Sequence, residues 1–137
     1  MKKIITICLL AICIVSVANA QKKTHRIVFE ITTSDTAEQR TTLRQMHNVL
    51  RDVPGTKIEL VCHGPAIFML VKAKTFFEED MQQLKNSGVV FAACANSMRK
   101  NNLDKTQMVS IATVVPNGVM EVVSKEEDGW SYIKAGG

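Results

Sequence analysis

The chain has 137 residues, 46% of them hydrophobic and 22% charged, and a formal net charge of +4. A chain of this size can bury one hydrophobic core without metal or disulfide support, and its composition excludes intrinsic disorder, collagen-like repeats and a disulfide-rich scaffold. Lys2 and Lys3, in the leader described next, contribute two of the positive charges. The remaining chain has no strongly basic field, so we do not expect nucleic-acid binding.

Residues 1–20 have the three parts of a secretory signal peptide: a charged start, an apolar run at 4–17 and an A-x-A cleavage sequence at 18–20. The apolar run is shorter than the roughly 18–20 residues that a membrane span needs. We therefore expect cleavage after residue 20 and no stable membrane span afterwards. A lipoprotein is the weaker alternative, because the LAIC sequence at 10–13 has a bulky residue where a lipobox needs a small one.

Residues 21–137 contain no linker, repeat or low-complexity tract and are predicted to form a single domain. Export places this domain in the periplasm or outside the cell, where thiols face oxidation. Of the 4 cysteines in the chain, Cys62 and Cys94 remain after cleavage.

Strands and helices alternate from the start of this domain. Enrichment in β-branched and aromatic residues predicts a strand at 25–32, and apolar residues at helical spacing predict a helix at 34–53. A nearly continuous apolar run predicts a strand buried on both faces at 57–62. A short helix is expected at 66–71.

The second half of the chain continues the alternation. Thr75 and Glu78 are spaced as a capping box. The expected elements are a helix at 75–87, a strand at 89–93, a short helix at 96–100, a strand at 109–115, a helix at 116–127 and a short strand at 130–133. This alternation predicts a layered α/β domain with helices packed on a parallel sheet.

Cys94 is the residue whose position most favours chemistry, because it follows a predicted buried strand and precedes a helix start. A thiol at a helix N-terminus lies near free N–H groups and the positive end of the helix dipole, which favour the reactive thiolate. Arg99 and Lys100, about one turn further on, add positive potential. The position alone fits a small buried side chain equally well, since most unpaired cysteines are of that kind.

Cys62, His63 and Gly64 follow another predicted strand, so they and Cys94 fall at the carboxyl ends of strands, where ligands gather in open parallel sheets. His63 suits either a hydrogen bond to a thiolate or bound anion, or the commoner role of capping loop backbone. Gly64 predicts a tight turn or a close backbone approach. Cys62 and Cys94 lie within disulfide range only if their strands are neighbours, and the sequence leaves strand order open.

No metal-ligand spacing and no nucleotide-binding motif is present, so neither a metal site nor a cofactor is predicted. Three blocks nevertheless resemble the DsrE/DsrF-like family, between about residues 57 and 135: VCHGPAIFML, LKNSGVVFAACANSMRKNN and VVPNGVMEVVSKEEDGWSYIKAG. The resemblance implies a compact α/β/α domain that usually forms oligomers. With the residue pattern, it predicts a three-layer α/β/α fold with a mainly parallel five-stranded sheet.

The resemblance also implies a role in sulfur relay, in which one cysteine carries sulfur as a persulfide. Cys94 matches that cysteine, His63 and Gly64 match the family's His-Gly pair, and Asn96 and Arg99 are expected to contact the bound group. The leading hypothesis is an exported DsrE-like protein that handles sulfane sulfur on Cys94, as a transferase or a carrier. The expected partners are copies of itself and proteins that donate or accept sulfur.

Two alternatives stay open. One is a non-enzymatic oligomeric protein that binds a small ligand near His63 and Cys94, with the cysteine only lining the pocket. The other is a thiol–disulfide redox module in which Cys62 pairs reversibly with Cys94 or resolves an intermediate formed on it.

Overall fold

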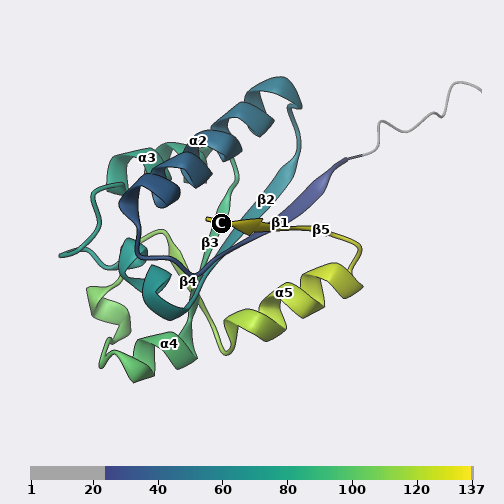
Figure 1. Cartoon of the computed structure of the whole chain (residues 1–137). Coiled ribbons are helices and arrows are strands. Elements are labelled where there is room, and N and C mark those ends of the chain that lie inside the picture. The colour runs from purple at the N-terminus through teal and green to yellow at the C-terminus, as the bar shows by residue number, and fades with distance from the viewer. Residues whose placement is uncertain (1–23, 137) are drawn as a thin grey trace, which may run out of the picture.

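The computed structural model describes residues 24–136; the predicted leader at 1–20 lies outside the described residues. A five-stranded sheet organises these residues, with the strand order β4-β3-β2-β1-β5 and every neighbouring pair parallel (Figure 1). The strands are β1 (Arg26–Ile31), β2 (Lys57–Cys62), β3 (Val90–Cys94), β4 (Ala112–Val115) and β5 (Ser131–Ala135). The predicted α/β class is confirmed.

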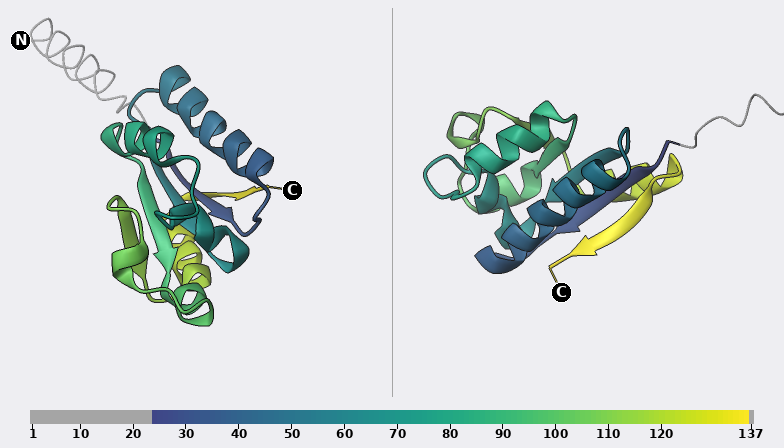
Figure 2. Two further views of the ribbon diagram at one scale, coloured as in Figure 1. Left: turned by 90° about the vertical axis from the view of Figure 1, so that its left-hand side faces the viewer. Right: turned by 90° about the horizontal axis from the view of Figure 1, so that it is seen from above.

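Helices cover both faces of the sheet, which gives the three layers that were expected. The α-helices are α2 (Thr36–Asp52), α3 (Glu78–Asn86), α4 (Ala95–Lys100) and α5 (Gly118–Glu127), and the 3-10 helices are η1 (Gly64–Leu70) and η2 (Lys105–Gln107). Helices α2 and α3 pack on one face and α5 on the other (Figure 1). Figure 2 shows β5, in yellow, at one edge of the sheet beside β1.

Two hydrophobic cores fill the spaces between the layers, because alternate strand residues face opposite sides of the sheet. The larger core joins the sheet to α2 and α3 and includes Leu60, Cys62 and Ala93. The smaller core joins the sheet to α5 and consists of Val28, Val61, Ala92, Val115 and Val122. Side chains two positions further along each strand point to the same side, so the residues that follow this core by two positions face α5 as well.

Several predicted boundaries move for identifiable reasons. Helix α3 begins at Glu78 rather than Thr75, because the Thr75 hydroxyl accepts from the Phe77 N–H and closes a turn before the helix. Strand β4 begins three residues later than expected, because the Val109 N–H donates to the Leu70 carbonyl and so ties this segment to η1. Strand β5, which was expected to end at residue 133, extends to residue 135.

Candidate functional site

Cys94 ends β3 at the carboxyl edge of the sheet, and two helices begin beside it. It is the N-cap residue of α4, and its Sγ accepts a hydrogen bond from the N–H of Gly118, the first residue of α5, at 3.2 Å. The residue is 4% exposed. The side chain is thus mostly covered but lies at the edge of the sheet, among backbone N–H groups of two helix N-termini.

These donors set the ionisation of the Cys94 thiol. Burial raises its pKa, but the Gly118 N–H bonded to Sγ, together with the nearby backbone N–H groups of Asn96 and Ser97 and the Ser97 hydroxyl, outweighs burial and brings the pKa below its ordinary value. Hydrogen bonds to a charged form favour that form. Since the thiolate is the nucleophile of cysteine chemistry, Cys94 is the candidate reactive group.

The lowered pKa predicts how alkylation of Cys94 depends on pH. We expect its reaction with iodoacetamide to reach half of its maximal rate below pH ~8.5, the value for an unperturbed cysteine, because the thiolate persists to lower pH. Mass spectrometry of the intact protein measures this rate at each pH as the growth of the species with one label per chain. The same chain in denaturant, with both thiols accessible, is the control. A midpoint at or above that of free cysteine would contradict the expectation.

Gly118 approaches Cys94 because it has no side chain. A Cβ at this position would lie 3.2 Å from Cys94 Cβ and 3.1 Å from His63 Cβ, closer than such atoms usually pack. The Asn117 side chain caps α5 by accepting from the N–H groups of Val119 and Met120, at 3.0 and 3.4 Å. The Gly118 N–H is therefore left for the sulfur.

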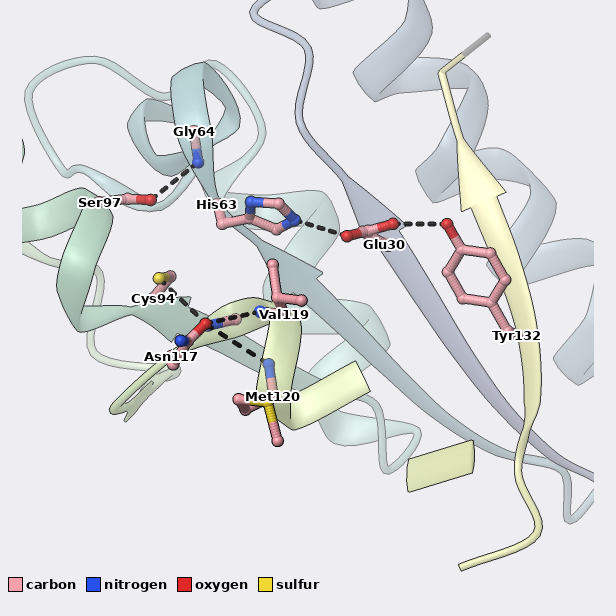
Figure 3. A network of polar contacts seen from close by, with 10 residues as sticks. Glu30, His63, Gly64, Cys94, Ser97, Asn117, Val119, Met120 and Tyr132 are labelled. Carbon is pink, nitrogen blue, oxygen red and sulfur yellow. Dashed lines mark hydrogen bonds and ion pairs between the residues drawn. The ribbon is translucent and has the colours of Figure 1, made fainter. Parts of the chain in front are cut away.

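His63 lies next to Cys94 on the same face of the sheet. Residues Cys62 and Ala93 are paired across β2 and β3, so the residues that follow them, His63 and Cys94, are neighbours that face α5. His63 Nε2 lies 2.7 Å from Glu30 Oε1, and the Tyr132 hydroxyl donates to Glu30 Oε2 (Figure 3).

These contacts favour the ionised form of the Glu30 carboxylate. Burial raises its pKa, but the hydrogen bonds from Tyr132 and His63, with the charges of His63 and Lys134, bring it below the ordinary value. The hydrogen bond between the Tyr132 hydroxyl and Glu30 raises the pKa of Tyr132 to about 12. Glu30 and Tyr132 were not predicted as site residues. A carboxylate within the apolar strand sequence RIVFEI was the available signal for the first.

Gly64 connects the loop after β2 to α4. Its φ of 56° is one that glycine adopts readily, and its N–H donates to the Ser97 hydroxyl at 2.8 Å. A hollow of about 140 Å³ lies beside this bond. Its lining residues are Gly64, Pro65, Phe68, Ser97, Lys100 and Asn101.

Asn96 and Arg99, whose expected contact with the bound group stays a prediction, lie on α4, and Cys62 ends β2. Asn96 and Arg99 are exposed, and the Asn96 side-chain oxygen accepts from the Arg99 guanidinium, so only the backbone of Asn96 acts on the thiol. Cys62 is fully buried, and burial raises the pKa of its thiol well above the ordinary value.

The two thiols do not form a redox pair in this structure. Strands β2 and β3 are neighbours, but Cys62 is paired with Ala93 and faces α2 and α3, whereas Cys94 faces α5. Both cysteines are free. The roles of Cys62 as a disulfide partner or resolving thiol are corrected accordingly, because the sheet separates the two sulfurs.

Comparison with known proteins places the chain in a family. The model of the DsrE/DsrF-like family matches residues 12–135. The chain belongs to the DsrE/DsrF-like family. A solved structure with the same fold is that of a protein of unknown function, MTH1491, from Methanobacterium thermoautotrophicum; the identity is 27%, the TM-score 0.77, and the match covers 80% of this chain and 98% of that one. No curated protein matched.

The family match spans every residue of the site in this DsrE/DsrF-like protein, from Glu30 to Tyr132. The family is generally connected with sulfur relay. Within residues 24–136, no three His, Cys, Asp or Glu side chains are grouped so as to hold a metal ion. None of the helices in that part of the chain is long and apolar enough to span a membrane.

Proposed function

We propose that this DsrE/DsrF-like protein takes up sulfane sulfur on Cys94 and passes it to an acceptor. The observation that carries the proposal is the Gly118 N–H bonded to Cys94 Sγ, which with the N–H groups of α4 favours the thiolate. The family's general connection with sulfur relay supports it.

The transfer exchanges one S–S bond for another. The Cys94 thiolate attacks the outer sulfur of a hydropersulfide R–S–SH or an inorganic polysulfide. A bond forms between Sγ and that sulfur, the donor's S–S bond breaks, and its electron pair leaves on the donor thiolate. The product is a Cys94 persulfide, and attack by an acceptor thiolate on its outer sulfur reverses the sequence without an external oxidant.

Export and assembly are part of the proposal. The signal-peptide pattern of residues 1–20 supports a periplasmic or secreted protein, whose sulfur donor and acceptor are then extracytoplasmic. Val119 and Met120, each 52% exposed, stand next to Gly118 at the start of α5. They offer apolar contact area for a donor or acceptor protein or for a second copy of the chain.

Intact-mass spectrometry tests the proposal directly. The reduced mature protein is exposed to inorganic polysulfide beside the variants Cys94→Ser and Cys62→Ala, the second being the matched thiol control. We expect added sulfur on the wild type and on Cys62→Ala and none on Cys94→Ser. Equal adducts on all three proteins, or no adduct on the wild type, would refute a carrier thiol at Cys94.

The alternative of a small-ligand-binding protein has one observation behind it, the hollow beside Gly64 and Ser97. Its volume of about 140 Å³ is below the roughly 300 Å³ at which ligand pockets usually begin. The geometry therefore favours the thiol chemistry. Ligand binding that survives in Cys94→Ser would restore the alternative.

A further inference from the structure

Two hollows adjoin on the surface around η1. Both are lined by Pro65, which is exposed, and by Phe68, which is half-buried. The two residues are three positions apart, and side chains at this spacing in a 3-10 helix point in the same direction, so they form a wall that the hollows share. One hollow measures about 140 Å³ and the other about 220 Å³. Together the two hollows and this wall form a groove.

The smaller hollow reaches the Cys94 site through Ser97. Ser97 lines this hollow, and its hydroxyl accepts from the Gly64 N–H at 2.8 Å (Figure 3). The same hydroxyl lies close enough to Cys94 to lower the pKa of its thiol. A chain that lies in the groove therefore passes within one side chain of Cys94.

The larger hollow ends at Phe76, in the loop between η1 and α3. The Phe76 side chain is 80% exposed. Aromatic residues are enriched at the centres of protein interfaces, where a partner covers them. On its other side Phe76 borders a hollow lined by Arg40, Glu79 and Asp80, where both signs of charge occur. The groove therefore runs from Ser97 to Phe76 and changes its electrostatic character there.

Between these ends the charge of the groove has one sign. Lys74 lines the larger hollow and Lys100 the smaller one, and among residues 24–136 no Asp or Glu lines either. The Lys74 ammonium lies 5.5 Å from the centre of the Phe68 ring, on the shared wall. The Asp35 carboxylate accepts from backbone N–H groups at the start of α2. Charge complementarity thus favours an occupant that carries carboxylates.

We propose that the groove binds an acidic peptide segment of the protein that accepts sulfur from Cys94. This inference rests on the proposed function of Cys94. Each hollow is smaller than the roughly 300 Å³ at which pockets for single small ligands begin, so the pair suits successive side chains of an extended segment. An apolar side chain of the segment covers Phe76, its carboxylates pair with Lys74 and Lys100, and its cysteine lies at the Ser97 end.

Docking in this register brings the thiolate of the segment to the persulfide on Cys94. The thiolate attacks the outer sulfur, a new S–S bond forms with the sulfur of the segment, and the S–S bond to Sγ breaks. The electron pair returns to Cys94 as its thiolate, and the segment leaves as a hydropersulfide. The exchange is balanced without an oxidant or a reductant.

Synthetic peptides separate binding from transfer. One peptide carries two glutamates, a leucine and a cysteine; the second has glutamines for the glutamates; the third is the first with serine for cysteine. The serine peptide cannot accept sulfur, so NMR titration of the nitrogen-15-labelled mature protein with it measures binding alone. Mass spectrometry measures the rate at which the persulfide protein passes sulfur to each cysteine peptide.

The variants are Lys74→Gln, Lys100→Gln and Phe76→Ala, all at exposed positions. Lys57→Gln is the charge control, because Lys57 is exposed at the start of β2, at the opposite edge of the sheet from Cys94. Val53→Ala is the apolar control, because Val53 is 44% exposed at the far end of α2.

We expect sulfur to pass to the glutamate peptide about tenfold faster than to the glutamine peptide, with the difference fading at high salt. Each lysine variant weakens binding of the serine peptide about three- to fivefold, and Phe76→Ala weakens it about tenfold. Phe76→Ala loads sulfur from inorganic polysulfide as the wild type does, and both controls follow the wild type throughout.

Two failures are distinguishable. If the wild type loads sulfur from polysulfide but passes it equally to the glutamate and glutamine peptides, or if the groove variants bind the serine peptide as the controls do, this inference alone is overturned. If the wild type takes up no sulfur, the proposed function is overturned and this inference with it.

Discussion

Replacing Lys125 by alanine is expected to lower the free energy of unfolding by about 3–5 kcal/mol. Lys125 Nζ lies 2.7 Å from Glu59 Oε2, and Glu59, on the central strand β2, is 3% exposed. The ammonium also lies 4.7 Å from the centre of the Trp130 ring. Without Lys125 the carboxylate stays buried with no cation, which is far costlier than losing an exposed ion pair. Urea unfolding followed by circular dichroism measures the loss.

The pH dependence of that loss identifies its cause. Burial raises the pKa of Glu59 even with Lys125 present, and removing the cation raises it further. A group with a raised pKa in the folded state binds its proton more tightly there than in the unfolded chain, so the variant regains stability as the pH falls. Arg51→Ala, which breaks the exposed pair with Asp52, is the control and changes nothing measurable. An equal loss at pH 5 and pH 8 would contradict this account.

Replacing Gly118 by alanine is expected to slow alkylation of Cys94 about tenfold at neutral pH, equivalent to about one unit in its pKa. The added Cβ meets the Cβ atoms of His63 and Cys94 at 3.1 and 3.2 Å. The start of α5 must move, and the N–H bond to Sγ lengthens. Overpacking of this kind costs about 1–3 kcal/mol, partly offset because alanine favours helix more than glycine.

The measurement is the alkylation rate from pH 5 to 10 in wild type and variant. Ser124→Ala, an exposed substitution on the same helix, controls for general effects on α5. The pH midpoint should rise in Gly118→Ala only. An unchanged midpoint would mean that the N–H groups of α4 alone lower the pKa of the Cys94 thiol.

Much of the fold follows from local patterns in the sequence. The strand KIELVC has four apolar residues in six and proves to be buried on both faces of the sheet, as strands of parallel sheets are. Asp35 caps α2 by accepting from the Ala37 and Glu38 N–H groups. Local capping and periodicity are intrinsic to short segments, so sequence reasoning can recover them.

Strand order and the relations between distant residues could not be predicted in this way. Buried parallel strands look alike in sequence, so nothing local shows that β2 and β3 are neighbours or that β1 and β5 are. The proximity of His63 to Cys94 and the contact of Glu30 with Tyr132, 102 positions away, depend on that order. The sequence predicts a helix from residue 116, but the approach of Gly118 to Cys94 depends on the position of α5 in the fold.

Cys62, which plays no part in the proposed chemistry, provides an internal measure of folding. It is 0% exposed on β2, which lies between β1 and β3. An alkylating reagent reaches it only when the sheet opens, so its labelling rate in the absence of denaturant reports the population of open molecules. Cys94 is expected to react in the folded state. One mass spectrum of a labelled sample then reports both the reactivity of the site and the stability of the domain that holds it.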